Sequence, residues 1–234
     1  MTHRNARVIK LGGSLLGASE WPDAFRRWLA RQPPMPNVLI VGGGALADAI
    51  RGWDRIHRLT SHDAHWLAIA TMTLTARLAG KLLPEAALTG DWSIVLKFAG
   101  DFDPSGTVPF FGVRGEKGDC PPLAGQFSVK LLIFDPSRFL ETIEPTLDGE
   151  PLPASWDVTS DSIAARIARL LECRELILLK SRPPPKITKF ERLADSQFVD
   201  RAFPRFACEL PQVRFVNLRE EFRSVGLSPL GSWP

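Results

Sequence analysis

The feature that most limits the fold of this chain is an alternation of short, unbroken apolar runs with amphipathic segments. Runs without polar alternation are typical of strands buried on both faces of a parallel sheet. We expect strands at residues 7–11, 37–41, 93–98, 129–134 and 175–180, with a weaker sixth at 213–217. Helices are predicted at 20–31, 45–59, 63–83 and 162–171, the third with Leu67, Ala70, Leu74 and Leu78 on one face. This order favours βαβ units in an α/β fold, a three-layer α/β/α sandwich with a mostly parallel central sheet.

Two stretches interrupt the alternation. Residues 98–126 are rich in Gly, Pro and Asp, and they indicate a long loop or a distorted hairpin. Residues 181–186 contain three consecutive prolines, so no helix is expected directly after the fifth strand. We interpret residues 1–234 as a single domain, with an N-terminal half of about 1–150 and a C-terminal half of about 151–234.

Composition and charge exclude several classes of protein. The chain is 44% hydrophobic and 24% charged, which is typical of a globular protein and not of a disordered or fibrous one. Its net charge is only +3 and its basic residues are scattered among acids, so no nucleic-acid partner is expected. Three widely spaced cysteines predict reduced thiols, without a disulfide framework or metal-ligand pair. With no apolar run of roughly 18 residues and no apparent signal peptide, we expect no membrane contact and a cytoplasmic location.

Two glycine-rich turns follow the first two predicted strands. The first strand runs from Lys10 into Gly12-Gly13-Ser14, and the second ends in Gly42-Gly43-Gly44. Glycine leaves backbone N–H groups unshielded, and the N-terminus of a following helix adds the positive end of its dipole, so each turn is typical of an anion site. Lys10 would add a compact positive charge at the same place. The pair of turns favours phosphate binding, although glycine also serves packing alone in strand-to-helix connections.

Two other phosphate-binding motifs fit the chain poorly. No segment supplies the Gly, four residues and Gly-Lys-Ser/Thr of a Walker loop. Residues 42–47 formally match the dinucleotide fingerprint G-x-G-x-x-A, but that fingerprint needs an acidic residue at the end of a strand about 20 residues later. The corresponding region, 61–67, is helical in character. A nicotinamide-dependent oxidoreductase is therefore the minor alternative.

A cluster of Asp, Thr and Ser opens the predicted helix at 162–171. Thr159 or Ser160 is the expected N-cap, because short oxygen-bearing side chains accept hydrogen bonds from the first N–H groups of a helix. Capping does not account for Asp157 and Asp161 as well. One of these carboxylates is a candidate to hold a cation or to orient lysine ammonium groups, with helix capping as the plainer interpretation of Asp161.

These motifs together resemble a known superfamily. Lys-Leu-Gly-Gly-Ser at 10–14, Gly-Gly-Gly at 42–44 and Asp-Val-Thr-Ser-Asp-Ser-Ile-Ala-Ala at 157–165 are similar, in this order, to the amino-acid kinases, which include the aspartate, acetylglutamate, carbamate and uridylate kinases. The block at 157–161 is most similar to the branch of the archaeal methanofuran-pathway kinase, which phosphorylates a phosphate monoester. The resemblance implies transfer of the γ-phosphoryl group of ATP, with Mg²⁺, to a small anionic acceptor (a phosphate monoester or a carboxylate) in methanofuran or one-carbon cofactor biosynthesis.

The resemblance also implies a role for each motif. Lys10 would contact the transferred phosphoryl group, and Asp161 would orient the catalytic lysines. The backbone of Gly12, Gly13 and Ser14, with Ser160 nearby, would bind the phosphates of ATP. The second turn, Gly42, Gly43 and Gly44, would hold the anionic end of the acceptor. The N-terminal half would then bind the acceptor and the C-terminal half the nucleotide. A homodimer is expected by resemblance alone.

The chain departs from the family pattern after the fifth strand. Family members place a Thr-Asp-Val-Asp-Gly-like segment there, whereas here Lys180 is followed by Ser-Arg-Pro-Pro-Pro. Lys180 is a candidate second catalytic lysine, with Lys186 and Lys189 as competitors and a solvated strand end as the plain alternative. The altered segment leaves a second class open, a non-catalytic nucleotide- or anion-binding protein on the same fold.

Two further stretches hold weaker candidates. His62 and His65 share a helix face, and His65 is a candidate contact for the phosphate or carboxylate of the acceptor, with a half-buried structural histidine as the alternative. A zinc site is not expected from two histidines without a third ligand. Residues 195–205 either cover the nucleotide through Arg205 or pack three phenylalanines into the core, Phe198, Phe203 and Phe206.

Overall fold

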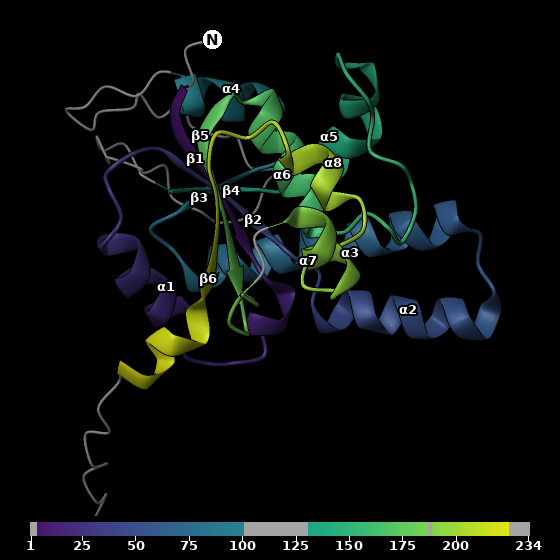
Figure 1. The fold of residues 1–234 in the computed structure, drawn as a ribbon, viewed down its shortest axis with the longest axis horizontal. Helices are drawn as coiled ribbons and strands as arrows, with labels where there is room; N and C mark the ends of the chain where they lie inside the picture. The colour runs from purple at the N-terminus through teal and green to yellow at the C-terminus, as the bar shows by residue number, and fades with distance from the viewer. Residues whose placement is uncertain (1–3, 101–130, 187–188, 225–234) are drawn as a thin grey trace, which may run out of the picture.

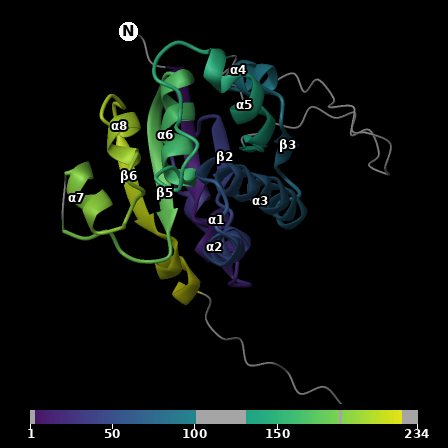
Figure 2. The ribbon, with the colours of Figure 1, turned by 90° about the vertical axis from the view of Figure 1, so that its right-hand side faces the viewer.

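The structure, a computed structural model, describes residues 4–100, 131–186 and 189–224. Its six strands form one sheet in the order β3-β4-β2-β1-β5-β6, and every neighbouring pair is parallel. Figure 2 shows this sheet running from β6 on the left to β3 on the right. The strands are β1 (Arg4–Leu11), β2 (Asn37–Val41), β3 (Ala87–Thr89), β4 (Leu131–Phe134), β5 (Cys173–Lys180) and β6 (Val213–Asn217). The predicted α/β class and parallel sheet are confirmed.

Helices cover both faces of the sheet and complete the three predicted layers (Figure 1). One face carries α4 (Trp92–Gly100), α5 (Ser137–Thr142), α6 (Ser160–Leu170), α7 (Phe190–Asp195) and α8 (Phe203–Ala207). The opposite face carries α1 (Trp21–Ala30) and the 3-10 turn η3 (Leu218–Ser224). The helices α2 (Ala45–His57) and α3 (Ser61–Leu82) form an antiparallel hairpin that projects from the sheet (Figure 1). Two shorter 3-10 turns are η1 (Gly13–Leu15) and η2 (Glu144–Thr146).

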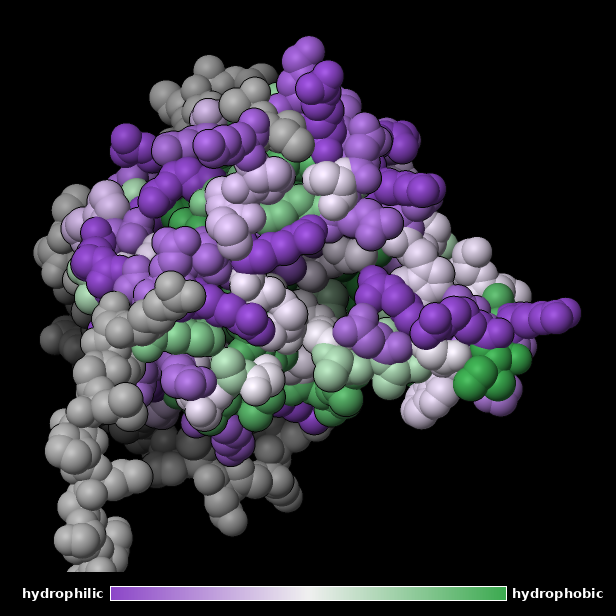
Figure 3. All heavy atoms as spheres, turned by 60° about the horizontal axis from the view of Figure 1, so that its bottom comes forward, coloured by the Kyte–Doolittle hydropathy of each residue, from purple (hydrophilic) through white to green (hydrophobic). Residues whose placement is uncertain are grey.

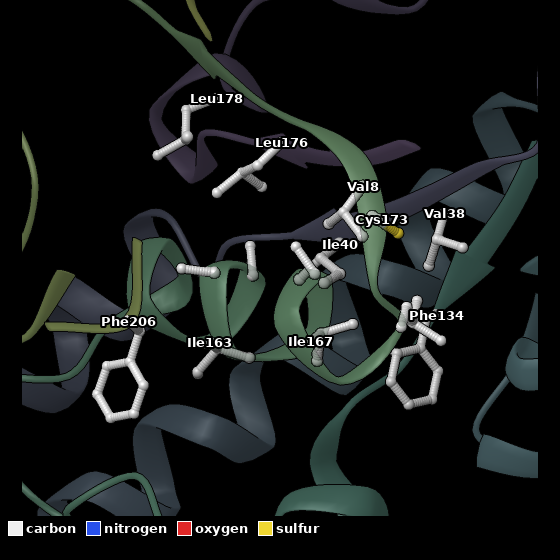
Figure 4. Packing of buried hydrophobic residues seen from close by; sticks show 14 of the residues in the cluster. Val8, Val38, Ile40, Phe134, Ile163, Ile167, Cys173, Leu176, Leu178 and Phe206 are labelled. Carbon is white, nitrogen blue, oxygen red and sulfur yellow. The ribbon is translucent and has the colours of Figure 1, made fainter. Parts of the chain in front are cut away.

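The buried strands divide their side chains between two apolar clusters, because successive residues of a strand point to opposite faces. On one face Val8 and Leu176 pack against Ile163 and Ile167 of α6 (Figure 4). On the other face Ile9 belongs to the cluster that includes α1. The strand alternation therefore directs the side chain at position 10 toward α6.

The strand order places the ends of three strands around one crevice. The chain passes from β1 to its neighbour β2 and later enters the opposite side of β1 with β5. Where neighbouring connections leave in opposite directions, α/β proteins bind ligands outside the carboxyl ends of the strands. The ends that meet here are those of β1, β2 and β5, which carry the glycine turns and Lys180.

The predicted strand at residues 93–98 is wrong, because these residues lie in α4. The carboxylate of Asp91 accepts a hydrogen bond from the backbone N–H of Ser93 at 2.8 Å at the start of this helix. The buried residues then recur at helical spacing: Trp92, Val95, Phe98 and Ala99. A short apolar run does not separate a buried strand from a buried helix. The strand of this region is β3, three residues at the sheet edge, which the sequence analysis missed.

Of the other local predictions, some are confirmed and the rest fall on residues outside the described ranges. No helix begins directly after β5, and Phe198, Phe203 and Phe206 are buried in the core, as predicted. Thr159 is the N-cap of α6, and its hydroxyl accepts from the N–H of Asp161. Of the predicted loop at 98–126, residues 98–100 belong to α4, and the rest lies outside the described residues, as do 129 and 130. No helix in the described ranges is long and apolar enough to cross a membrane.

The leucine face predicted for residues 63–83 is exposed. The buried side of α3 instead includes Ile69, Met72 and Ala76. Together with three residues of α2, the leucines form a surface that we call the hairpin face, with side chains 39% to 71% exposed: Leu46, Trp53, Ile56, Leu67, Leu74, Leu78 and Leu82. Figure 3 shows hydrophobic residues gathered at the tip of the hairpin, on the right. An exposed apolar surface of this kind often marks a contact with another molecule.

A buried ion-pair network joins four strands at the amino-terminal side of the sheet. Arg7 donates from Nε to Glu175 at 2.7 Å and from a guanidinium nitrogen to the side-chain oxygen of Asn37 at 3.0 Å. Arg214 donates to the second carboxylate oxygen of Glu175 at 2.9 Å. Arg7 is 1% exposed and Glu175 5%. Each charge is thus satisfied only while strands β1, β2, β5 and β6 keep their register.

We predict that Glu175→Gln lowers the free energy of unfolding by about 3 kcal/mol, because it leaves the buried Arg7 guanidinium without a compensating charge. Urea unfolding followed by circular dichroism measures the change. Glu85→Gln is the matched control, since Glu85 pairs with Arg26 at 2.7 Å on the surface and its loss should change the stability by less than about 1 kcal/mol. Equal losses in the two variants would contradict the prediction.

Candidate active site

Three charged side chains from three elements meet at the carboxyl edge of the sheet. Lys10 comes from β1, Lys180 ends β5, and Asp161 lies in the first turn of α6. The Nζ of Lys10 is 2.8 Å from Oδ1 of Asp161, and the Nζ of Lys180 is 2.5 Å from Oδ2. One carboxylate therefore bridges two ammonium groups. Lys180 is no solvated strand end, because its side chain is only 12% exposed.

The two lysines differ in how their hydrogens are used. Lys180 donates to Asp161 and also to the backbone carbonyl of Phe198 at 2.8 Å. Lys10 contacts Oδ1 of Asp161 at 2.8 Å and donates to no other group among the residues that the structure describes. Since an ammonium group has three hydrogens, two of those on Lys10 remain available to a ligand.

Burial and the charges of the neighbouring side chains shift the pKa values of Asp161 and Lys180. Burial opposes the ionised form of Asp161, but the charges of Lys10 and Lys180 outweigh it and hold the pKa of this carboxyl below its usual value. Burial, together with the charge of Lys10, lowers the pKa of Lys180 to about 8, although Asp161 acts in the opposite direction. With both lysines protonated, these three side chains together carry one excess positive charge, and the nearby carboxylate of Asp200 acts on Lys180 in the same direction as Asp161.

The two glycine turns touch. A Cβ on Gly13 would lie 2.2 Å from the backbone nitrogen of Gly44, and one on Gly42 would lie 2.8 Å from Oγ of Ser160. Gly44 also has a φ of +58°, a left-handed conformation that favours glycine. The glycines are therefore required by close approach of the backbone, which brings the ends of β1 and β2 and the start of α6 into one site.

The backbone N–H groups of the turns separate into two kinds. Gly12 donates to the carbonyl of Leu179 at 2.9 Å, and Gly42 donates to the carbonyl of Leu11 at 3.0 Å. These two groups continue the sheet and are not free for phosphate, so the expectation that the Gly12 N–H binds phosphate is wrong. The N–H groups of Gly13, Ser14, Gly43 and Gly44 donate to no group within the described ranges. They are the anion donors that the turns offer, beside the N-terminus of α2.

A cavity of about 240 Å³ opens beside these turns, and we call it the glycine pocket. Its polar lining includes the predicted Ser14, Ser160 and His65, together with Asp48 and Arg51, which the sequence analysis did not single out. Its apolar lining comes from α2, α3 and α6: Ala47, Ala68, Ile69, Met72 and Ile163. Ser160, expected beside the nucleotide, thus lies on the same pocket as the second glycine turn. His62 is exposed and does not line this pocket.

A second, wider cavity of about 960 Å³ adjoins the first, and we call it the lysine pocket. It is lined by Lys180 and Asp161 and by the α7–α8 region, including Phe198, Asp200 and Arg205. Arg51, Trp156 and Thr159 line both cavities and form their common wall. Two contacts hold Trp156 in this wall: its indole N–H donates to Asp54 at 2.7 Å, and the Arg51 guanidinium lies 4.8 Å from the centre of the indole.

Asp200 is a site residue that sequence reasoning missed. Its carboxylate accepts hydrogen bonds from the backbone N–H and hydroxyl of Thr159 at 2.9 and 2.7 Å, from the N–H of Ser162 at 3.0 Å and from the N–H of Phe203 at 2.9 Å. Burial and the nearby charge of Asp161 raise the pKa of Asp200. A lone aspartate in a mixed polar and aromatic segment carried no signal of this contact, which joins residues about forty positions apart. Asp200 holds the start of α6, and therefore Asp161, in place.

The segment after β5 is also anchored. Ser181 and Ser14 share a hydrogen bond of 2.9 Å that joins the ends of β5 and β1. Arg182 donates to the carbonyl of Gln197 at 2.7 Å. Lys186 and Lys189 do not line either cavity and do not enter the cluster with Asp161. Lys180 is therefore the lysine that this segment contributes.

In the described ranges no group of three or more His, Cys, Asp or Glu side chains is arranged to hold a metal ion. The cluster of Lys10, Asp161 and Lys180, with four free backbone N–H groups beside it, is instead suited to bind and neutralise phosphate oxygens. Such a site is able to bring two phosphate groups together.

Comparisons with known proteins agree with this chemistry. A family model described as the amino acid kinase family matches residues 5–184. A curated relative, the [5-(aminomethyl)furan-3-yl]methyl phosphate kinase of Methanocaldococcus jannaschii, is 24% identical over 172 residues, which cover 73% of this chain and 63% of that protein. The chain thus matches less than two thirds of the length of this relative.

Solved structures share the fold. The uridylate kinase of Archaeoglobus fulgidus has a TM-score of 0.54 with 14% identity, over 92% of this chain and 93% of that one. The UMP kinase of Ureaplasma parvum has a TM-score of 0.53 with 12% identity, over 94% and 92% of the two chains. At these identities the likeness concerns the fold alone.

We predict that Gly44→Ala lowers the free energy of unfolding by at least about 1 kcal/mol, because a Cβ at this φ is strained and would lie 2.5 Å from the carbonyl oxygen of Gly13. Thermal unfolding measures the effect. Gly52→Ala in the middle of α2 is the matched control: nothing lies within 4 Å of its Cβ, so it should raise stability by roughly 0.5–1 kcal/mol. A neutral Gly44→Ala would show that the contact between the turns is looser than described.

Proposed function

The chain belongs to the amino acid kinase family, and from this premise we propose that it is a phosphotransferase that moves the γ-phosphoryl group of ATP to a small anionic acceptor. The observation that carries the proposal is the bridging of Lys10 and Lys180 by Asp161, with Asp161 and Lys180 in the lining of the lysine pocket. Phosphoryl transfer needs little from a protein beyond positioning and stabilisation of spread negative charge. Two lysines, one of them with uncommitted hydrogens, meet that need.

We assign the glycine pocket to the acceptor and the lysine pocket to the nucleotide. The glycine pocket is lined mainly by residues of the N-terminal half and the lysine pocket by residues of the C-terminal half, which supports the expected division near residue 150. The triphosphate would reach from the lysine pocket toward the N–H groups of Gly13 and Ser14. The acceptor anion would lie against Gly43 and Gly44.

In the proposed step an oxygen of the acceptor anion attacks the γ-phosphorus of ATP in line. The bond between the γ-phosphorus and the β,γ-bridging oxygen breaks, and ADP leaves with the electron pair. Lys10 and Lys180 would neutralise charge on the transferred group, which reduces the repulsion between two anionic reactants. Since no described cluster of side chains offers a metal site, we propose that Mg²⁺ arrives bound to the nucleotide.

For the acceptor we favour a phosphate monoester over a carboxylate. The relative from Methanocaldococcus jannaschii is named for such a substrate, [5-(aminomethyl)furan-3-yl]methyl phosphate, which supports a place in methanofuran or one-carbon cofactor biosynthesis. Transfer to a phosphate monoester gives a pyrophosphate ester. Use of ATP also fits the expected cytoplasmic location.

The alternative is a protein that binds a nucleotide or an anion without transferring a phosphoryl group. The segment after β5 differs from the family pattern, which first raised this possibility. Lys180, the last residue of β5, nevertheless donates a hydrogen bond to the carboxylate of Asp161, and this contact favours a working enzyme. Measured turnover decides between the two classes.

We predict that Lys10→Ala abolishes ATP-dependent phosphorylation of the acceptor and weakens binding of Mg·ATP, because the ammonium hydrogens available to phosphate are lost. Isothermal titration with Mg·ATP, with Mg·ADP and NAD⁺ for comparison, and coupled detection of ADP measure both effects. Lys81→Ala, on an exposed part of α3, is the control and should keep full activity. Normal turnover by a folded Lys10→Ala protein would refute the assignment.

We predict an alkaline limb in the pH profile of kcat/KM. Lys180 acts as a cation, and since its pKa is lowered to about 8, the rate of the free enzyme should fall as the pH rises through this value. Lys180→Arg keeps its charge to high pH, so its rate, although lower because the guanidinium fits differently, should be flat between pH 7 and 9.5. A wild-type profile that is flat over the same range would contradict this role.

We also propose that the chain forms a homodimer through the hairpin face, whose seven large apolar side chains are 39% to 71% exposed on two adjacent helices. Leu74→Glu, at the middle of this face, should shift the mass measured by sedimentation from dimer to monomer, because a buried unpaired carboxylate is costly. Arg77→Glu, on the same helix but outside the hairpin face, should leave the dimer intact. A monomeric wild-type protein at micromolar concentration would exclude the proposal.

A further inference from the structure

The glycine pocket has two chemically different ends. At one end are the free N–H groups of Gly43 and Gly44 at the start of α2. At the other end are Arg51, about 10 Å further along α2 at 1.5 Å per residue, and His65, near the start of the antiparallel α3. The rest of the lining mixes apolar residues, such as Ile69 and Met72, with polar ones, such as Asp48 and Ser160. A ligand that reaches from the glycine turns to His65 therefore has one anionic end and a second end at His65.

The protonation state of the second end follows from a single hydrogen bond. Nδ1 of His65 lies 3.1 Å from the backbone carbonyl of Ser155. A carbonyl only accepts, so Nδ1 carries the hydrogen, and in a neutral imidazole Nε2 then presents a lone pair. Burial lowers the pKa of His65, which favours this neutral form. Nε2 has no partner among the described residues, and His65 lines the cavity.

The charged groups around His65 are already compensated. Asp48 pairs with Arg51 at 2.7 Å, and Arg51 also covers the ring of Trp156. Trp156 is held in turn by Asp54. His65 is only 6% exposed, whereas the side chains of Asp48 and Arg51 are 71% and 43% exposed. The deepest polar feature at this end is thus a hydrogen-bond acceptor.

We propose that His65 recognises the non-reacting end of the acceptor and selects a molecule that carries a hydrogen-bond donor there, an amine or ammonium group. The inference rests on the proposed function, because it takes the glycine pocket as the acceptor site. It also changes the role expected of His65 from the sequence, since a neutral imidazole with a lone pair repels a phosphate or carboxylate. The anionic end of the acceptor belongs to the glycine turns.

The test compares two acceptors that differ only at the second end: [5-(aminomethyl)furan-3-yl]methyl phosphate and its analogue with a methyl group in place of aminomethyl. For the wild-type protein we expect kcat/KM, and the affinity measured by titration, to favour the amine at least tenfold. A site built around a hydrogen bond rejects an analogue that lacks it, because its own polar group is then left unpaired.

His65→Phe keeps an aromatic ring and removes the lone pair, so the preference for the amine over the methyl analogue should fall below threefold. His62→Phe, on the same helix and outside the pocket, is the matched control and should retain the full preference. A difference between these variants separates recognition from a general effect on the fold of α3.

The outcomes distinguish this inference from the proposed function. If both acceptors are phosphorylated equally well, the protein is a kinase and the role of His65 is refuted. If neither is phosphorylated but the amine binds at least tenfold more tightly, the kinase assignment fails and the recognition by His65 stands. A wild-type preference for an analogue with a carboxylate at this end, or no binding of either compound, overturns the inference.

Discussion

The site depends on one buried carboxylate placed between two lysines. One carboxylate oxygen of Asp161 forms an ion pair with Lys10, and the other forms an ion pair with Lys180. Removing these charges from water is costly unless each has a partner. Lys180 has two partners, Asp161 and the carbonyl of Phe198, whereas Lys10 has only Asp161 among the described residues. The Lys10 ammonium is therefore the less satisfied of the two cations.

The surrounding structure serves to hold Asp161 still. Asp200, in a segment that follows β5, accepts five hydrogen bonds, four of them from Thr159 and Ser162 around the start of α6. Lys180 and Arg182 are tied to the same segment through the carbonyls of Phe198 and Gln197. Lys180 and Arg182 thus hold the end of β5 and the residue pair after it against the α7–α8 region.

The same framework explains why the two pockets have different characters. The glycine pocket is narrow because the turns of β1 and β2 are in contact, a closeness that only residues without a Cβ allow. The lysine pocket, of about 960 Å³, is wider, and two short helices, α7 and α8, contribute to its lining. Their shared wall, Arg51, Trp156 and Thr159, comes from two distant parts of the chain. A small acceptor and a larger nucleotide suit this difference in volume.

The sequence by itself determined the elements whose signal is local. Unbroken apolar runs identified five of the six strands. The two strand-end glycine turns and Lys10 were expected at one edge of the sheet, since parallel strands bring their carboxyl ends together, and the resemblance to the amino-acid kinases added Asp161. Local pattern failed where two structures share it: residues 93–98 form a helix, and the leucine face of α3 is exposed because the hairpin buries the opposite side.

Only the tertiary structure decided the rest, because those features depend on residues far apart in the chain. The contact of Asp200 with Thr159 joins segments separated by 41 positions, and the tautomer of His65 is set by a carbonyl 90 positions away. The choice of Lys180 over Lys186 and Lys189 follows from the position of the strand end relative to α6. Sequence spacing describes which groups a chain carries, whereas their protonation, partners and access are fixed by packing across the fold.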